Sequence, residues 1–357
     1  MGSYKKKLKD FPEYERRLWR SFDREVFETG AALDRLDETT ILELIDYSAY
    51  FELLNVKLPE SRRGILDHFK QDGVIKRSSV GWAISNLGAM LFARDLRSIP
   101  RLARKTVRVI QYEGNSRVKT IRERELVRGY AAGFAPLIEY ITTVLPRNEI
   151  IGRALRAEES LYPELAIREL VANMLIHQDF TETGTGPVVE IFENRMEITN
   201  PGQPVIDASR FVDLPPKSRN EGIASMARRV GIAEERGSGW DKVAFQVEVF
   251  QLPAPRVEVT PSHTKAVLLA PRSLTRMERE DRVRAVYLHA CLREVTGEQT
   301  TNASVRERFG ITQSNAPQAS KLLSEAVAAG VIAVYDLDSG FRNRRYVPYW
   351  AVPESVA

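Results

Sequence analysis

The sequence of 357 residues contains one cysteine and only four histidines. A single thiol, Cys291, cannot build an internal disulfide framework or a cysteine-based zinc site, which fits a reducing compartment. We therefore expect a cytoplasmic protein. His68, His263 and His289 stand far apart without metal-ligand spacing, so we expect them and Cys291 to be structural.

Long apolar runs are also missing. No stretch reaches the roughly 18 residues that a membrane helix needs, and the start, MGSYKKKLKDF, lacks an apolar signal core. We therefore expect neither secretion nor contact with a membrane. Charge is nearly balanced, with 52 basic and 48 acidic residues, so the pI near 9.0 permits a polyanionic partner without establishing one.

Several catalytic signatures are absent. The chain has no G-x-x-x-x-G-K-[ST] phosphate loop, which argues against a helicase motor. It also lacks H-E-x-x-H, paired zinc-binding cysteines and a G-x-S-x-G elbow, so metalloprotease and serine hydrolase chemistry have no motif support.

Length and hydrophobic periodicity predict three units. Apolar residues at helical spacing within 40–94 indicate a mostly helical N-terminal region, 1–100. A strand at 106–114 and a helix over about 123–143 begin the middle unit, 101–272. The last unit, 273–357, should hold three helices and a hairpin turning at Ser339-Gly340, which is the outline of a winged helix.

The middle unit continues with a helix at 163–180, opened by Pro163 and regular in its apolar positions. PVVEIFENRMEITNPG then reads as two β-rich runs around Glu193-Asn194. A polar loop, a helix around 223–230, a glycine turn opening another helix, and one or two strands in RVEVTPSHTKAVLLAP follow. This order predicts an α+β fold with a mixed layer of helices and strands.

A polar ridge follows one side of the predicted helix 163–180. Glu169, Asn173 and His177 recur every four residues and so share one face. A carboxylate can orient or deprotonate a water, and an amide oxygen one turn away can bind Mg²⁺, which bridges phosphates. The spacing fits nucleotide chemistry, although the solvated face of an amphipathic helix would show the same pattern.

Three glycines accompany this ridge. Gly202 ends a predicted strand, where it would let the backbone approach a ligand, and Gly237 and Gly239 open a helix whose free N–H groups could bind phosphate. Ordinary turns or helix caps are the alternative for each glycine. Arg219, in PPKSRNE, could close over phosphate oxygens, or could be a surface arginine in a loop.

LAIRELVANMLIHQDF, MEITNPG, SRNE and EERGSGWDKV resemble the motifs of the RecG-type carboxy-terminal ATP-binding family, a divergent branch of the GHKL (Bergerat-fold) ATPases. The resemblance implies a Bergerat-like α/β sandwich that binds ATP and Mg²⁺. It implies a base at Glu169 and a magnesium ligand at Asn173. The other nucleotide-binding positions are His177, Asn200, Gly202, the lid 203–221 with Ser218, Arg219 and Asn220, then Gly237, Gly239 and Thr264.

Two features depart from that pattern. Members of the superfamily carry an aspartate in the first glycine motif to recognise the adenine amino group, whereas this chain has Asn200, which can accept a hydrogen bond without carrying charge. Many family members also begin with a Schlafen-type AlbA-like domain. Here only the first seven residues resemble the end of such a domain, so we expect a shortened chain.

The C-terminal unit has a candidate DNA-binding surface. Its residues are the polar groups Gln313, Asn315, Gln318 and Lys321 and the hairpin arginines Arg342, Arg344 and Arg345. Eleven basic and nine acidic residues lie between 276 and 345, so the electrostatic signal is small. A winged helix that binds protein or mediates dimerisation is the alternative.

The sequence therefore predicts an ATP-responsive, DNA-binding transcriptional regulator. A homodimer would suit a winged-helix DNA binder, because operators often mirror a two-fold axis. Two alternatives stay open: an ATPase enzyme, in which Glu169 drives hydrolysis coupled to a nucleic-acid or defence process, and a degenerate pocket that serves as a scaffold.

Overall fold

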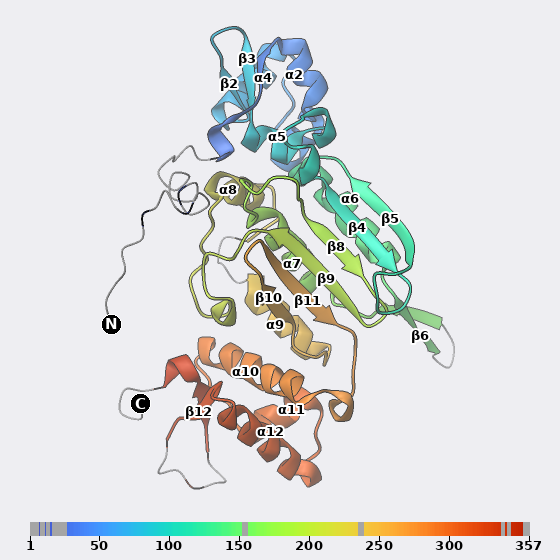
Figure 1. The fold of residues 1–357 in the computed structure, drawn as a ribbon, viewed down its shortest axis with the longest axis vertical. Helices are drawn as coiled ribbons and strands as arrows, with labels where there is room; N and C mark the ends of the chain where they lie inside the picture. The colour runs from blue at the N-terminus through green and yellow to red at the C-terminus, as the bar shows by residue number, and fades with distance from the viewer. Residues whose placement is uncertain are drawn as a thin grey trace.

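The computed structural model describes residues 27–151, 156–234, 239–336, 340 and 344–352, together with 7, 11 and 15. These residues form a mixed α+β fold along one long axis, with an N-terminal unit at one end and a group of helices at the other (Figure 1). No helix within them is both long and apolar enough to cross a membrane.

The N-terminal unit contains a sheet that the expectation of a mostly helical region missed. Its strands are β1 (Ala31–Leu36), β2 (Ile75–Arg77) and β3 (Trp82–Ser85), antiparallel in the order β1-β3-β2. The sheet was not expected because its strands are short and β3 is buried at every position, so no alternating pattern marks it. The helices of the unit are α2 (Glu38–Leu44), α3 (Tyr47–Leu53), α4 (Arg62–Gln71) and α5 (Asn86–Phe92).

Side-chain caps set the starts of these short helices. Asp37, Asp46, Ser61 and Ser85 each accept a hydrogen bond from the backbone N–H three residues later. Such caps satisfy N–H groups that a helix leaves without partners, and each typically contributes about 1 kcal/mol. Helices of seven to ten residues can therefore form where propensity alone would not sustain them.

The middle of the molecule is a six-stranded sheet in the order β10-β11-β9-β8-β4-β5. Strands β4 and β8 are parallel, whereas the other neighbours are antiparallel. The strands are β4 (Val107–Tyr112), β5 (Thr120–Leu126), β8 (Val188–Ile191), β9 (Arg195–Pro201), β10 (Arg256–Val259) and β11 (His263–Leu269). A separate hairpin joins β6 (Arg147–Ile151) and β7 (Arg156–Ser160).

The helix expected over 123–143 is replaced by two elements. Residues 120–126 belong to strand β5, and helix α6 occupies Tyr130–Val144. The N-terminal limit was wrong because β5 alternates charged residues that are exposed along almost the whole strand, which leaves no apolar face to mark it. Gly129, at the start of α6, lies so close to the backbone of residues 91–93 that a Cβ there would clash.

Helices cover one face of the central sheet. Helices α6, α7 (Glu164–Ile176) and α9 (Gly239–Val249) lie behind the strands in the view of Figure 1. One buried apolar cluster runs from Ala32 in the N-terminal unit to Leu268 in β11. The predicted boundary at residue 100 therefore has no break in the core beside it, and the division into domains stays a prediction.

The opposite face of the sheet carries a small buried apolar cluster of Ile110, Tyr112 and Phe192 and, next to it, a charged network centred on Arg117. This guanidinium donates to both carboxylate oxygens of Glu190, at 2.7 Å each, and to Glu197 at 2.9 Å. Lys265 Nζ lies 3.3 Å from the same Glu197 carboxylate. Both glutamates are buried, and the cations beside them offset the cost of burying two negative charges.

Helix α8 (Glu221–Arg229) joins the middle of the molecule to the N-terminal unit at both of its ends. At its start, the buried Glu28 accepts hydrogen bonds from the N–H groups of Gly222, at 3.1 Å, and Ile223. At its end, Arg229 donates to both oxygens of Asp72, which follows α4. A carboxylate at a helix start and an arginine at its end both complement the helix dipole.

The C-terminal residues form a smaller unit with its own apolar cluster. Its elements are α10 (Arg279–Val295), α11 (Asn302–Phe309), α12 (Ala316–Ala328), β12 (Ile332–Val334) and β13 (Tyr346–Pro348). Strands β12 and β13 pair antiparallel. Gln313 and Asn315 lie in a 3₁₀ turn before α12, not on the helix, because Pro317 suits the first turn of a helix that begins at Ala316.

A buried polar cluster ties this unit to α9. The Arg308 side chain, 1% exposed, donates to the Leu252 carbonyl oxygen at 2.7 Å. Its Nε lies 3.5 Å from the Glu248 carboxylate, and His289 Nδ1 approaches the same carboxylate at 3.0 Å. Burial lowers the pKa of the Arg308 guanidinium, although Glu248 opposes that shift.

Replacing Arg308 with alanine should destabilise the protein strongly. The change leaves the Glu248 carboxylate without its arginine partner, and breaking a buried pair in this way typically costs about 3–5 kcal/mol. Urea unfolding should report this loss in the free energy of unfolding. Arg279→Ala, at an exposed position of α10, should change it by less than about 0.5 kcal/mol. Equal stabilities of the two variants would contradict the assignment.

Candidate functional site

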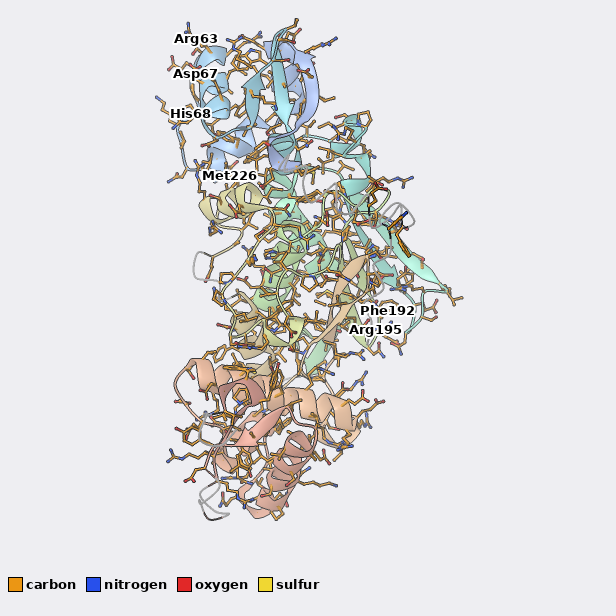
Figure 2. The ribbon with its side chains drawn as sticks, turned by 60° about the vertical axis from the view of Figure 1, so that its left-hand side comes forward. Arg63, Asp67, His68, Phe192, Arg195 and Met226 are labelled. Atoms are coloured by element: carbon orange, nitrogen blue, oxygen red, sulfur yellow. The ribbon has the colours of Figure 1, made fainter. Side chains whose placement is uncertain are left out.

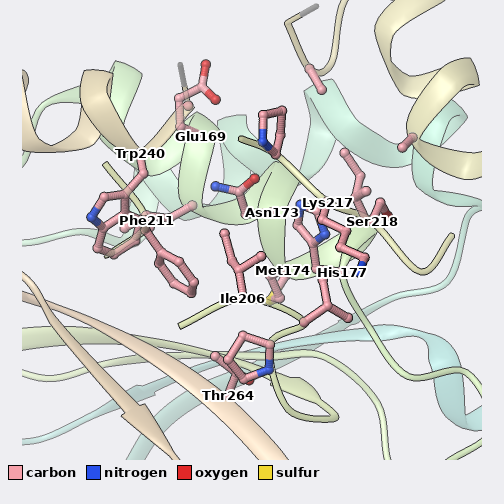
Figure 3. Close-up of a pocket in the computed structure, with 18 of the residues that line it drawn as sticks. Glu169, Asn173, Met174, His177, Ile206, Phe211, Lys217, Ser218, Trp240 and Thr264 are labelled. Carbon is pink, nitrogen blue, oxygen red and sulfur yellow. The ribbon is translucent and has the colours of Figure 1, made fainter. Parts of the chain in front are cut away.

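A cavity of about 250 Å³ opens between α7, the strands β9 to β11, the segment 203–221 and the start of α9. In Figure 3, Asn173 and Ile206 lie near its middle, Phe211 and Trp240 on one side, and Lys217 and Ser218 on the other. Eight of the residues selected from the sequence line it: Glu169, Asn173, His177, Asn200, Ser218, Arg219, Gly239 and Thr264.

The polar ridge of α7 faces this cavity. Glu169 and Asn173 stand on successive turns, and Glu169 is only 8% exposed. A solvated helix face is therefore not the explanation for this spacing. The helix is shorter than expected, because it ends at Ile176 and His177 is its C-cap residue.

Burial controls the charge of Glu169. It raises the pKa of this carboxyl, while Lys242, whose Nζ lies 4.0 Å from Oε1, acts in the opposite direction. Gly239 faces the same carboxylate, and a Cβ at that position would lie 2.9 Å from Oε2. A carboxyl with a raised pKa is a better general base than an exposed one, provided that it is ionised.

His177 lies in the same wall as a neutral side chain. Burial, and to a lesser extent the nearby Arg219, lower its pKa to about 4. A neutral imidazole has one donor and one acceptor nitrogen, so near neutral pH it can bind polar groups without adding charge to the cavity.

Two paired strands form the floor. Asn200 in β9 stands directly opposite Thr264 in β11. The Asn200 amide nitrogen donates to the Pro201 carbonyl oxygen at 3.2 Å, and Thr264 Oγ1 donates to the Gly202 carbonyl oxygen at 2.7 Å. With its nitrogen engaged, Asn200 can offer its amide oxygen to a ligand as an acceptor.

Gly202 and Asn220 do not line the cavity. Gly202 has φ +94°, and a Cβ there would lie 2.5 Å from Cβ of Asp179. Glycine is therefore required at this position by the contact with Asp179, and not by a ligand. Asn220 is buried and donates to the carbonyl oxygens of Ile176 and Gln178. Both residues shape the cavity indirectly, and Gly237 lies outside the described residues.

Arg219 holds the segment 203–221 against the end of α7. Its NH1 donates to Asp179 Oδ2 at 2.7 Å, and its NH2 donates to the Gln203 carbonyl oxygen. The same side chain lines the cavity. In this arrangement Arg219 fastens both ends of the segment, and a phosphate group would compete with Asp179 for it.

Sequence reasoning missed the apolar and basic residues of the segment 203–221 and its neighbours. Phe211 and Trp240 form an edge-to-face pair with ring centroids 5.3 Å apart. Ile206, Lys217 and Arg228 also line the cavity. The available signal was the apolar content of PVIDASRF, which is unusual for a loop that simply crosses the surface.

The pKa of His177 predicts a loss of stability in acid. An unfolded histidine titrates near 6.5, so between that pH and about 4 the unfolded chain binds more protons than the folded one. The free energy of unfolding should therefore fall as the pH drops through this window. A fully buried ring would lose up to about 3 kcal/mol, and the partial exposure of His177 makes the loss smaller.

Urea unfolding at about pH 7 and about pH 4.5 would measure this effect. His177→Gln should remove most of this part of the pH dependence, and His68→Gln, outside the cavity, should preserve it. An identical pH dependence in His177→Gln and the parent would show that the group is not buried as described.

Residues 184–268 match the family described as "Putative ATP-dependent DNA helicase recG C-terminal". A search of curated proteins found no match. The fold is similar to the crystal structure of the DIP2311 protein from Corynebacterium diphtheriae, with a TM-score of 0.56 and 15% identity over 93% of this chain and 67% of that one.

The family match covers the floor of the cavity, the segment 203–221 and the start of α9, and it begins after α7. Asn200, Arg219, Gly239 and Thr264 therefore lie inside it, whereas Glu169 and Asn173 lie before it. Over residues 184–268, the chain thus matches the RecG-type carboxy-terminal family that the sequence motifs indicated.

Proposed function

We propose that the cavity binds ATP with Mg²⁺ and that the protein is an ATP-responsive, DNA-binding transcriptional regulator. The convergence of the motif residues on one cavity supports this proposal most directly. They come from α7, from β9 and β11, from the segment 203–221 and from α9, which are separated by up to 95 positions of the chain. Unrelated surface residues would not gather in this way.

The fold suits this proposal. A Bergerat-like α/β sandwich requires a mixed sheet with helices on one face, and the presence of such a layer supports this part of the proposal. We assign the three C-terminal helices and the pair β12–β13 to a winged helix on the same basis. The name of the matched family includes ATP dependence, which supports nucleotide binding here.

The lining residues fit a nucleotide with a bound magnesium ion. Lys217, Arg219 and Arg228 supply positive charge for phosphates, and the amide of Asn173 is a suitable oxygen ligand for Mg²⁺. The metal would neutralise phosphate charge and fix phosphate geometry. Because the cavity is smaller than the roughly 300–1,000 Å³ usual for ligand pockets, we expect the segment 203–221 to move outward when a triphosphate binds.

The position of the cavity favours sensing. Trp240 at the start of α9 lines the cavity, and Glu248 near the end of the same helix contacts Arg308 and His289 of the C-terminal unit. A ligand that shifts α9 would therefore act directly on this buried cluster. A ligand can shift a protein between two conformations only if it makes different contacts in each of them.

The C-terminal unit would supply the DNA contacts. Gln313, Asn315, Gln318 and Lys321 are all exposed, as expected for residues that meet DNA. Arg345 is exposed and donates to Gln299 at 3.1 Å, whereas Arg344 is half-buried and less suited to phosphate contact. Arg342 lies outside the described residues. A homodimer would place two such units on a two-fold symmetric site.

Isothermal titration with ATP and Mg²⁺ tests the cavity. We expect micromolar binding by the parent chain and at least about tenfold weaker binding by Asn173→Ala, which removes the proposed metal ligand. Gly239→Ala should also weaken binding, because its Cβ would displace the Glu169 carboxylate at little cost to folding.

Gln246→Ala removes an amide from α9 outside the cavity and should bind as the parent does. Absence of binding by the parent chain would rule out the ATP proposal and leave the degenerate scaffold.

Glu169→Ala separates the sensor from the enzyme. If the chain is an ATPase, this variant should lose about 10²- to 10⁴-fold in turnover while it still binds ATP, because a general base acts on the attacking water. Glu164→Ala, exposed on the same helix, is the matched control. Steady-state phosphate release measures both variants, and turnover unaffected by Glu169→Ala would exclude Glu169 as the base.

A further inference from the structure

The N-terminal unit contains a second combination of a helix and a β-hairpin. Strand β1 leads through α2 and α3 to α4, and the hairpin β2–β3 follows. The sheet order β1-β3-β2 places the hairpin beside the first strand. A helix-turn-helix followed by a hairpin is a common DNA-docking arrangement, with the second helix in the major groove.

Basic side chains project from this helix and hairpin. Arg62, Arg63 and Lys70 of α4 are exposed, and so are Lys76 and Arg77 of β2. Arg63 and Lys70 are seven residues apart, which places them on one face of the helix, two turns from each other. Figure 2 shows Arg63 and Asp67 on the outer side of α4, at the edge of the molecule.

Nearby carboxylates do not neutralise the basic residues of α4. Asp46 pairs with Arg94 and Arg128, Asp72 pairs with Arg229, and Asp95 pairs with Arg97. Within the described part of the chain, no carboxylate lies within ion-pair distance of Arg63 or Lys70. Asp67, which is exposed on α4 between those two residues, adds one negative charge to this face.

The scaffold beneath these side chains is preformed. Ile65, Leu66 and Phe69 anchor α4 in the core, and the Ser61 side chain caps its start. On the hairpin, the Arg77 guanidinium stacks 3.7 Å above the Trp82 ring. Lys76 Nζ donates to the Thr29 carbonyl oxygen at 2.9 Å, which fixes the base of the hairpin. A rigid surface of this kind loses little conformational entropy when it binds a partner.

We propose that this surface, formed by Arg62, Arg63, Asp67, Lys70 and Arg77, binds double-stranded DNA. Helix α4 enters the major groove, and the hairpin contacts the sugar-phosphate backbone. Arg63 is suited to bidentate contact with guanine, and Asp67 can accept from the amino group of cytosine. An RNA duplex is excluded as the partner, because its deep and narrow major groove does not admit a helix.

This surface is distinct from the C-terminal unit and does not depend on the ATP cavity. Helix α4 carries three cations, Arg62, Arg63 and Lys70, with Asp67 as its acidic residue, whereas Lys321 is the only basic residue of α12. On charge alone, α4 is therefore the stronger of the two candidate DNA-binding helices.

Fluorescence anisotropy of a labelled duplex of mixed sequence, about 30 base pairs or three helical turns, tests the proposal with the full chain. Arg63→Ala with Lys70→Ala should weaken binding at least about tenfold at moderate salt. The slope of log affinity against log salt should become shallower by about 0.9, because Lys70 contacts a phosphate whereas Arg63 contacts a base. Exchanging the charges as Arg63→Lys with Lys70→Arg should preserve the slope.

Arg101→Ala with Arg104→Ala removes the same charge from exposed positions elsewhere and should leave binding unchanged. Thermal melting confirms that each variant is folded. The proposal is overturned if the α4 variant binds like the parent, or if the Arg101 and Arg104 variant loses as much. It is also overturned if an RNA duplex binds as tightly, or if only Lys321→Ala with Arg345→Ala weakens binding.

Discussion

Burial of helix α7 on nearly every side is the constraint on which the candidate site depends. Its apolar residues pack against the central sheet and against the neighbouring helices α6 and α9. A polar residue on such a helix needs either a partner or an opening, because burying it unpaired costs free energy. The ridge of Glu169 and Asn173 therefore opens into a cavity, and the packing of α7 determines where that cavity lies.

The fold and the site were predictable to different extents. The ridge, the floor strands and the start of α9 could be found from the sequence, because each depends on local spacing or on a glycine at a turn. Strands β1 to β3 could not be found, since three to six residues are too few to show a reliable period and β3 is buried at every position. Phe211 and Trp240 could not be assigned either, because their pairing joins a loop and a helix that only the tertiary fold brings together.

Gly202 and Asn220 show the limit of reasoning from motifs. Both occupy positions that the family resemblance assigns to the nucleotide, yet their contacts are with Asp179 and with the end of α7. A motif can include residues that support the walls of a site as well as residues that face its cavity. The spacing in the sequence does not distinguish the two kinds, because the direction of each side chain depends on the tertiary fold.

The bond from Arg308 to the Leu252 carbonyl oxygen has a consequence for where this protein can be divided. A chain cut near residue 272 would remove the guanidinium that covers Glu248 and the end of α9, and would expose the apolar contact around Ala254 and Leu288. The C-terminal unit has its own apolar cluster, but the piece before it would be left with Ala244 and Ala254 in contact with water. The end of α9 is therefore stabilised by contacts from both sides of residue 272, and a boundary drawn there would cut through them.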